Sequence, residues 1–268
     1  MNNKIIQLNN RAVISITGKD SLDFLQSIVT IDLEDPNTKL FSSCLLTPQG
    51  KLLYHFFLYK IENGFLIDIH NSSIDEFINK IEFYKLMSEI IIKNRKDLEV
   101  ISSDEKIFED MWLDPRNNNL GWRGIRETEE EEKEDLKFYE IKKIYSCIIE
   151  QGEDVSSEEF FPMELNYDNL NSISFDKGCF IGQEVTSRMY RKGKAKKRVF
   201  SFQSKKILEK GQKIFFNDKN IGQILKTINL NGIALIKVDS IPLIKKDPEK
   251  IFINKDSCKI NFDFHKNR

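Results

Sequence analysis

The chain has 268 residues, 40% of them hydrophobic, which is enough to build a sizeable core in one large or two to three smaller domains. Charged residues make up 31%, but the formal net charge is only −1, so bulk electrostatics do not favour nucleic acid or an anionic membrane as a partner. Cys44, Cys147, Cys179 and Cys258 lie far apart and form no Cys-x-x-Cys pair, which argues against a zinc or ferredoxin-type metal site.

The N-terminal residues give no targeting signal. Met1 to Ile6 contain no long apolar run and no Arg- and Ser-rich amphipathic stretch. The longest apolar runs in the chain are also much shorter than a membrane span. We therefore expect a cytoplasmic protein with reduced thiols and no membrane segment.

The first half of the sequence predicts a sheet with helices packed on it. Four strands are expected, over 11–16, 40–46, 52–59 and 65–69. Asn63-Gly64 is a strong short-turn signal between the last two of them. Asp20 can cap a first helix, and Ser73 opens a capping box before a second one. The region is thus predicted to be of the α+β class.

An acidic run, Glu127 to Asp135, marks the middle of the chain. Because like charges repel, we interpret it as a solvated loop or a mobile helix start, with an acidic docking site for a partner as the alternative. The residues from Leu136 to Ile149 then predict a helix. Tyr139 and Lys143 lie one turn apart on one face of it.

The last 70 or so residues predict only short strands, over 199–202, 213–216, 221–228, 233–238 and 258–264. Asn231-Gly232 reads as the turn of a hairpin between two of them. This pattern is typical of a small antiparallel β-barrel or sandwich. We therefore expect two domains, residues 1–195, with two subdomains, and residues 196–268.

The densest group of reactive residues is the stretch from Asp176 to Glu184, with the sequence Asp-Lys-Gly-Cys-Phe-Ile-Gly-Gln-Glu. Gly178 and Gly182 lie on either side of Cys179 and allow a positive φ there, so the backbone can approach a ligand closely. Lys177 is placed to favour the thiolate, the reactive form of cysteine. These residues predict a site loop; the alternative is a tight turn around a buried, inert cysteine.

The octapeptide from Lys177 to Glu184, preceded by Pro162-x-Glu164-x-Asn166, resembles the signature of the YgfZ family of folate-binding proteins. These proteins are relatives of the glycine-cleavage T-protein and support iron–sulfur enzymes. The segments Thr17–Gln26 and Gly50-Lys51 also resemble this family. Two further segments, Asp114-Pro115-Arg116 and Leu120-Gly121-Trp122-Arg123, resemble its mitochondrial branch and the α-proteobacterial relatives. The resemblance implies a T-protein-like folate-binding fold with a C-terminal β-barrel, in a monomer.

The resemblance also implies tetrahydrofolate, or a one-carbon or polyglutamyl derivative, as the ligand. In the family a comparable helix carries an aromatic residue and, four residues later, an arginine, followed by a Gly-x-Pro-Glu-Gly loop near the folate. Tyr139 and Lys143 take those places here, but lysine lacks the planar fork of arginine and only Gly152 of the loop is kept. Glu164 and Asn166 would line the neighbouring cavity.

One departure argues against glycine-cleavage chemistry. Aminomethyltransferases carry an Asp-Asp pair shortly after a Gly-Gly turn, and one aspartate helps to activate the reacting folate-bound amine. In this chain the corresponding pair is Tyr54-His55, and neither is a carboxylate. We therefore expect no aminomethyltransferase activity, and we interpret His55 as a packed residue.

A basic cluster follows the motif: Arg188, Arg191, Lys192, Lys194, Lys196, Lys197 and Arg198. We interpret it as a solvated strand and linker, or as a surface that attracts the glutamate tail of a polyglutamylated folate. RNA contact is the third interpretation. It is disfavoured because no recognised RNA-binding module surrounds the cluster.

The leading hypothesis, by resemblance, is a tetrahydrofolate-binding accessory protein for the assembly or repair of 4Fe–4S clusters in client enzymes, among them radical and tRNA-modifying enzymes. Cys179 is its functional thiol and Lys177 tunes that thiol, while Gln183 and Glu184 hold the loop by hydrogen bonds. Gly178, Phe180 and Gly182 complete the motif, and Arg188 is a folate contact. The alternatives are a folate-dependent one-carbon transferase with an unknown acceptor and a non-catalytic docking scaffold.

Overall fold

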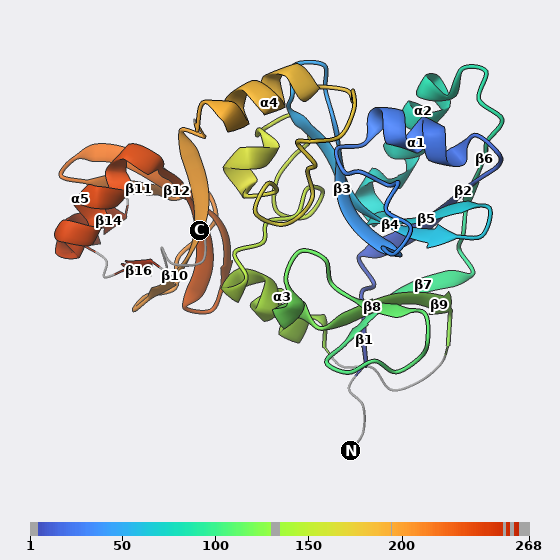
Figure 1. The fold of residues 1–268 in the computed structure, drawn as a ribbon. Helices are drawn as coiled ribbons and strands as arrows, with labels where there is room; N and C mark the ends of the chain where they lie inside the picture. Colours follow the sequence, from blue (N-terminus) through green and yellow to red (C-terminus); the bar gives the residue numbers. More distant parts are fainter. Residues whose placement is uncertain (1–4, 130–134, 194, 254–255, 258–259, 263–268) are drawn as a thin grey trace.

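The computed structural model describes residues 5–129, 135–193, 195–253, 256–257 and 260–262, which form three antiparallel sheets joined by helices and a long irregular segment (Figure 1). A five-stranded sheet lies at the right of Figure 1, a four-stranded sheet at the bottom and a seven-stranded sheet at the left. This mixture of sheets and packed helices confirms the predicted α+β class.

The five-stranded sheet has the strand order β3-β4-β5-β2-β6. Its strands are β2 (Arg11–Thr17), β3 (Leu40–Leu46), β4 (Leu52–Ile61), β5 (Gly64–His70) and β6 (Ile91–Asn94). The helices that cover its outer face are α1 (Ser21–Ile28) and, after η1 (Asn71–Ser73), α2 (Ile74–Lys85). They bury Leu25 and Phe77 against Phe56, whereas Cys44 and Leu52 on the opposite face turn to the centre of the molecule. The four strands predicted here are confirmed.

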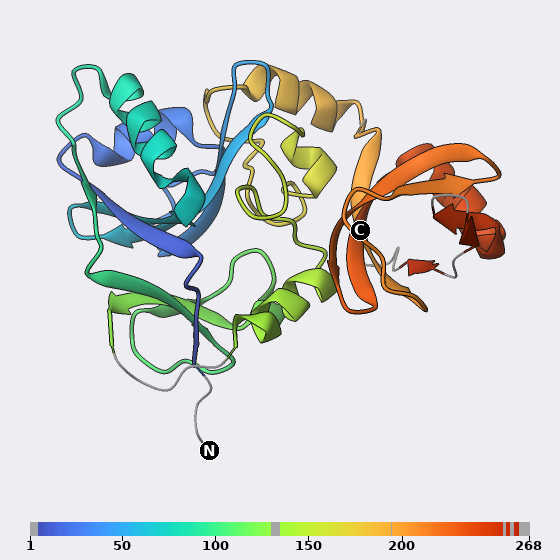
Figure 2. The same ribbon diagram turned by 180° about the vertical axis from the view of Figure 1, so that it is seen from behind.

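The four-stranded sheet, with the order β1-β7-β9-β8, lies below the first (Figure 2). It consists of β1 (Ile5–Gln7), β7 (Leu98–Ser103), β8 (Met111–Leu113) and, after η2 (Asn118–Leu120), β9 (Trp122–Glu127). Residues 130–134 of the predicted acidic run lie outside the described residues. Asp135, at its end, caps α3 (Leu136–Tyr145) by accepting a hydrogen bond from the Lys137 backbone.

An irregular segment, residues 146–182, fills the centre between the sheets and contains η3 (Pro162–Leu165). α3 ends at Tyr145, before the predicted Ile149, because the chain turns inwards at Cys147, where φ is +57°. The turn buries Ile148 and Ile149 completely beside Tyr167. If the helix continued to Ile149, the side chains of Ile148 and Ile149 would point in different directions and only one of them could face the core. α4 (Gln183–Arg191) then leads to the third sheet.

The seven-stranded sheet has the order β15-β14-β11-β12-β13-β10-β16. Its strands are β10 (Lys197–Ser204), β11 (Lys213–Phe216), β12 (Lys219–Ile228), β13 (Asn231–Lys237), β14 (Ile251–Ile253), β15 (Asp256–Ser257) and β16 (Ile260–Phe262). Between β13 and β14 lie three helical turns that the sequence pattern did not predict: η4 (Val238–Ser240), α5 (Ile241–Lys246) and η5 (Pro248–Lys250). Among the described residues no ladder joins β15 to β16, so the predicted closed barrel is not confirmed. The domain boundary at 195/196 stays a prediction.

A buried network of charges lies where the first two sheets meet. Asp68 of β5 accepts hydrogen bonds from Arg11 of β2 (2.5 Å from Nε to Oδ1) and from Arg123 of β9 (2.5 Å from Nη2 to Oδ2). The guanidinium carbons of Arg123 and Arg116 lie 4.0 and 4.6 Å from the ring centroid of Phe57. Burial disfavours the charge of Arg123, but nearby groups, chiefly Asp68, outweigh this and raise its pKa.

A second group of charges joins the centre to the seven-stranded sheet. Lys226 of β12 contacts three carboxylates: Glu140 of α3 (2.5 Å), Glu153 (2.7 Å) and Asp154 (2.8 Å). Lys143 contacts Glu140 and Glu153 from the other side, at 2.6 and 2.8 Å. This sheet is therefore attached by buried ion pairs as well as by apolar contacts.

We predict that Arg123→Met lowers the free energy of unfolding by about 3–5 kcal/mol, because it leaves the buried Asp68 carboxylate with one arginine partner instead of two. Urea unfolding measures this. Arg95→Met is the control, since the Arg95–Asp97 pair is exposed and its loss should change the stability little. Equal effects of the two substitutions would contradict the prediction.

Candidate functional site around Cys179

Cys179 is exposed, on the loop that leads into α4. Cys44 and Cys147 are both buried, and Cys258 lies outside the described residues. Burial raises the pKa of the Cys44 thiol, which makes it inert at neutral pH. The sequence left open a tight turn around a buried cysteine, and the structure excludes that alternative for Cys179.

Lys177 anchors the loop to the end of α1. Its buried ammonium donates hydrogen bonds to the backbone oxygens of Gln26, Val29 and Ile31, each at 2.8 Å. Burial lowers the pKa of Lys177 to about 8, against the opposing effect of Asp32 and Glu34. The ammonium therefore keeps its charge and its three N–H donors at neutral pH. That Lys177 also tunes the thiol stays a prediction.

Gly182 fixes the other end of the loop. Its φ is +81°, and a Cβ there would lie 2.6 Å from the backbone oxygen of Thr47, in the turn between β3 and β4. In the same turn Gly50, with φ of +79°, lies against the side chain of Val185. Gly178 does not have a positive φ, and a Cβ there would meet nothing within 4 Å. The positive φ that was expected on both sides of Cys179 thus occurs only at Gly182.

The remaining motif residues hold the loop in different ways. Gln183 donates from Nε2 to the backbone oxygens of Lys177 (3.3 Å) and Gly178 (3.2 Å), as expected. The ring of Phe180 is buried in the central core. The carboxylate of Glu184 is exposed and makes no hydrogen bond within the part of the chain that the structure describes, so of the two residues expected to hold the loop by side-chain hydrogen bonds only Gln183 does so.

A cavity of about 540 Å³ opens beside the loop, along one face of α4. It is lined by Phe175, Lys177, Gln183, Glu184, Ser187, Arg188, Arg191 and Lys192. Arg188, predicted to contact folate, is exposed here. Lys177 and Gln183, from the two ends of the Cys179 loop, thus line the same cavity as Arg188, Arg191 and Lys192.

The other predicted folate contacts lie elsewhere. Tyr139 is buried in the charge network, where its hydroxyl accepts hydrogen bonds from Arg116 (2.8 Å) and Arg123 (2.7 Å). Lys143 is fully buried and contacts Glu150 at 3.0 Å. Burial would raise the pKa of Glu150, but Lys143 and Arg116 hold it well below its usual value. Tyr139 and Lys143 are thus brought together, with their polar atoms bonded to the protein.

Glu164 lies within η3, and Asn166 is the residue at its C-terminal end. Asn166 is buried, with φ of +64°, and its Nδ2 donates to the Val199 oxygen at 2.9 Å. Glu164 accepts a hydrogen bond from the Phe161 backbone (3.1 Å) at the start of η3. Asn166 also lines a small cavity of about 160 Å³ together with Arg116, Asn117, Asn119, Tyr145, Ser146, Cys147, Asn169 and Leu170.

Sequence reasoning gave no role to Arg116 or Glu150, which lie at the centre of the buried network. The only signal was the Asp114-Pro115-Arg116 string, in which the Arg116 guanidinium now pairs with Asp114 at 2.8 Å and also with Glu150.

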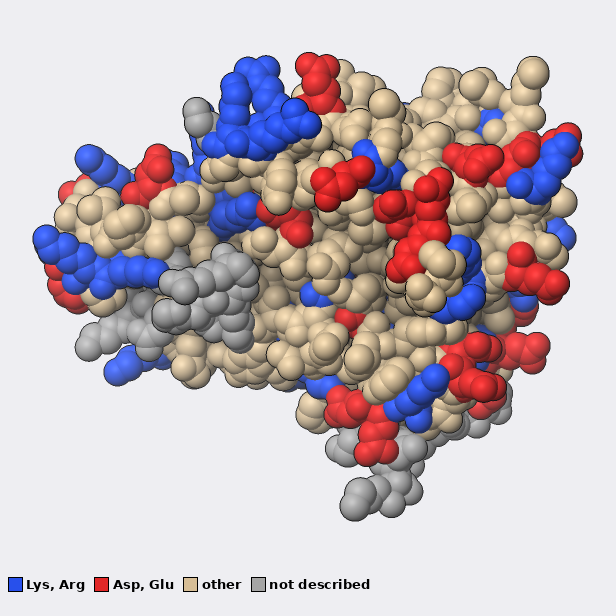
Figure 3. All heavy atoms as spheres, in the orientation of Figure 1, with Lys and Arg blue, Asp and Glu red and all other residues tan. Residues whose placement is uncertain are grey.

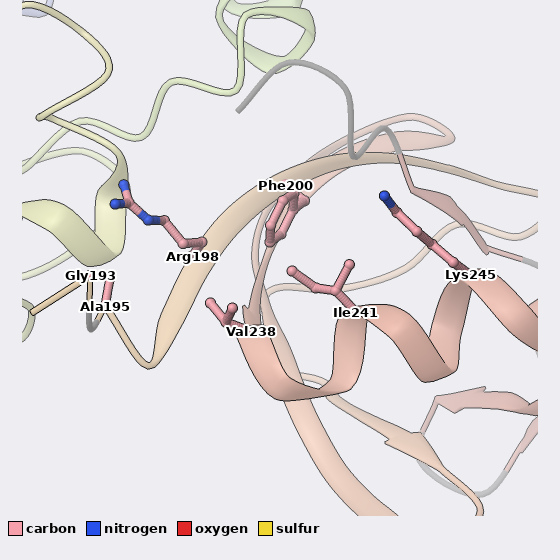
Figure 4. A pocket seen from close by; sticks show the side chains of 7 residues that line it. All are labelled: Gly193, Ala195, Arg198, Phe200, Val238, Ile241 and Lys245. Atoms are coloured by element: carbon pink, nitrogen blue, oxygen red, sulfur yellow. The ribbon is translucent and has the colours of Figure 1, made fainter. Parts of the chain in front are cut away.

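A third cavity, of about 290 Å³, lies where the end of α4 meets the seven-stranded sheet (Figure 4). There Phe200, Val238 and Ile241 point toward one another.

The Tyr54-His55 pair lies inside the five-stranded sheet. Tyr54 packs edge-on against Phe77 under α2, with ring centroids 5.4 Å apart. On the opposite face, His55 Nε2 lies 2.9 Å from Ser42 Oγ and its ring lies 4.8 Å from that of Tyr167. Burial lowers the pKa of His55 well below its usual value, so its ring is neutral. The interpretation of His55 as a packed residue is confirmed.

No model of a protein family matches the chain. Curated relatives are described as mitochondrial iron–sulfur cluster assembly factor IBA57 or its homologues. The protein from Pyricularia oryzae is 26% identical, over 72% of this chain and 55% of its own. The one from Dictyostelium discoideum is 27% identical, over 73% and 61%. The Mus musculus protein is 25% identical, over 72% and 64%. The chain thus spans little more than half the length of the relatives it matches.

Among solved structures, the glycine cleavage system aminomethyltransferase T from Bartonella henselae superposes with a TM-score of 0.76. The match covers 99% of this chain and 86% of that one, at 11% identity, so it shows the fold alone. The chain has a glycine-cleavage T-protein-like fold, as predicted. Its curated relatives are iron–sulfur cluster assembly factors, which fits the resemblance seen in the sequence; membership of the YgfZ family itself stays a prediction.

The expectation of a cytoplasmic protein is wrong, because the curated relatives are mitochondrial proteins by name. That expectation rested on the missing signal in the first residues, and such an absence says nothing about the location of the protein.

Within the described ranges no helix is both long and apolar enough to cross a membrane. In the same ranges no group of three or more His, Cys, Asp or Glu residues is placed to hold a metal ion.

Gly182→Ala should lower the free energy of unfolding by at least about 2 kcal/mol, because alanine is strained at this positive φ and its methyl group would meet the Thr47 oxygen. Gly178→Ala, in the same loop, should change it by less than about 0.5 kcal/mol. Chemical unfolding of both variants tests the assignment. A tolerated alanine at 182 would show that the loop is not fixed at this point.

Proposed function

We propose that this chain is an accessory factor for iron–sulfur cluster assembly and that it acts through the thiol of Cys179. The observation that carries the proposal is the exposure of Cys179 on a loop held at both ends, by Lys177 against α1 and by Gly182 against the β3–β4 turn. The curated relatives, which are assembly factors of this class, support it. Because the chain spans about half of their length, its substrates and partners remain part of the proposal.

The chemistry of the loop suits a transient ligand of iron. A cysteine thiolate is the usual protein ligand of iron–sulfur clusters, and a cluster generally needs four such ligands. The loop presents one thiol, and Cys44 and Cys147 are buried away from it. In this proposal the cluster is the cargo: Cys179 supplies one ligand while a client or assembly protein supplies the others. Radical and tRNA-modifying 4Fe–4S enzymes are the proposed clients.

Cys179→Ser should abolish this function without unfolding the protein, since an exposed side chain contributes little to stability. The measurement is the activity and iron content of 4Fe–4S enzymes in cells that lack the gene and carry either the wild type or the variant. We expect the variant to restore no more activity than an empty vector. Gly178→Ala serves as the loop control and should restore it fully. Full restoration by Cys179→Ser under oxidative stress would refute the role of the thiol.

We also propose tetrahydrofolate, or a one-carbon or polyglutamyl derivative, as a ligand; the support is the T-protein-like fold. Tyr139 and Lys143 bond to protein groups, so a folate that reached them would have to take over some of these bonds. Asn166 already borders an open cavity. A role as a folate-dependent one-carbon transferase has no observation of its own in its favour.

Calorimetric titration of reduced tetrahydrofolate into the purified protein tests the ligand. We expect saturable binding by the wild type and by Cys179→Ala alike, because the predicted folate contacts Tyr139, Lys143 and Asn166 are buried in the interior, whereas the thiol is exposed. Absence of binding to folded protein would remove folate from the proposal and leave the role of Cys179 in cluster assembly standing.

A further inference from the structure

We propose that the exposed face of α4 is a docking surface for an acidic segment of the partner protein that exchanges a cluster with Cys179. We call this face, made by Ser187, Arg188, Arg191 and Lys192, the α4 basic face. The inference rests on the proposed function and adds to it the contact surface and the chemistry of the partner. It does not depend on folate.

The helical period places the basic residues together. Residues 184, 187, 188, 191 and 192 follow the spacing i, i+3, i+4, i+7 and i+8, so they share one side of the helix. All five line the 540 Å³ cavity beside the Cys179 loop. Thr186, on another side of the helix, is buried. Arg188, Arg191 and Lys192 are exposed to solvent, and the first residue of the face, Ser187, follows Cys179 by eight positions in the chain.

The positive charges of this face are not neutralised by acidic side chains within the described part of the chain. Arg188, Arg191 and Lys192 have no ion-pair partner there, whereas the buried Arg116, Arg123 and Lys143 each pair with a carboxylate. The helix dipole favours cations in the last turn, which Arg188 and Arg191 occupy. That effect does not select a side of the helix, yet all three side chains line the same cavity. Figure 3 shows Lys and Arg atoms gathered over α4.

An aromatic pair adds contact area next to these charges. The rings of Phe175 and Tyr190 are stacked, with centroids 3.6 Å apart and planes inclined by 10°. Phe175 lines the cavity, and Tyr190 is 51% exposed although it is a large side chain. Tyrosine and arginine are the residues most enriched among the dominant contacts of protein interfaces. The stack also fixes α4 against the segment that precedes the loop.

The partner should be acidic for two reasons. Free guanidinium and ammonium groups on one face attract carboxylates and speed up encounters with an oppositely charged surface. A cluster held by thiolates is itself an anion, because each thiolate ligand brings a negative charge. From Gln183 to Arg191 the helix rises by roughly 12 Å, about the length of four extended residues. A short run of carboxylates can therefore span the face while its carrier reaches Cys179.

A disulfide-exchange assay tests the inference with the full chain. The probe is a glutamate-rich decapeptide whose central cysteine is capped with 2-nitro-5-thiobenzoate. The Cys179 thiolate attacks the peptide sulfur, the capping S–S bond breaks, and the coloured thiolate leaves with its electron pair. The same peptide with glutamine in place of glutamate is the neutral reference. Every protein carries Cys258→Ser, and Cys179→Ala should release no thiolate.

We expect the acidic peptide to react about tenfold faster than the neutral one at low salt, and the difference to shrink as salt is added. The triple variant Arg188→Gln, Arg191→Gln, Lys192→Gln should lose this preference. A matched triple variant, Lys205→Gln, Lys206→Gln, Lys246→Gln, removes the same charge from exposed positions on the seven-stranded sheet domain and should keep it.

Equal rates for the two peptides would overturn the inference, as would an equal loss of preference in the two triple variants. Uncapped competitors separate the other possible ligands. If a γ-linked glutamate oligomer, or an RNA oligonucleotide of equal charge, slows the reaction more than an α-linked glutamate peptide does, the face belongs to a folate tail or to RNA and the inference is wrong. None of these outcomes bears on whether Cys179→Ser supports cluster enzymes, so the two proposals can fail separately.

Discussion

The structure depends on the pairing of charges in its interior. Asp68 holds two arginines from two different sheets, and the three guanidinium groups of Arg11, Arg116 and Arg123 surround the ring of Phe57. A buried charge without a partner costs several kcal/mol, so these side chains can be buried only when the sheets are correctly placed. The network therefore makes less of a contribution to stability than its number of contacts suggests, but it penalises any other arrangement of the sheets.

The Cys179 loop shows how an irregular segment obtains a defined position. The backbone oxygens at the end of α1 have no donor within the helix, and Lys177 donates hydrogen bonds to them. Gly182 lets the backbone pass close to Thr47. Between these two points the thiol is left in solvent, while Lys177 and Gln183 line the cavity beside α4.

Local patterns predicted the regular parts of this fold well. The strand from Leu40 to Leu46 follows from residue types that act over a few positions. A hairpin also joins β12 and β13, but it turns at Asn229-Leu230, whereas the predicted turn residues Asn231 and Gly232 pair with Ile228 and Thr227 inside the sheet. The sequence did not reveal that Lys177 contacts α1, that Arg116 pairs with Glu150, or that α5 lies in the last sheet region, because such contacts are decided by the folded packing. A site loop around Cys179 was predicted from its two glycines, of which only Gly182 has the positive φ that the argument assumed.

The anchor of the loop also has a consequence for folding. Lys177 contacts the Gln26 backbone across 151 positions of the sequence, and closing so long a loop is an entropic cost that local contacts cannot offset early in folding. During synthesis the N-terminal sheet can form long before this contact exists. The thiol thus takes its place only after α1, the first sheet and the central segment have been assembled. An incomplete chain also exposes this thiol, but only a folded molecule holds it in a fixed position between α1 and α4.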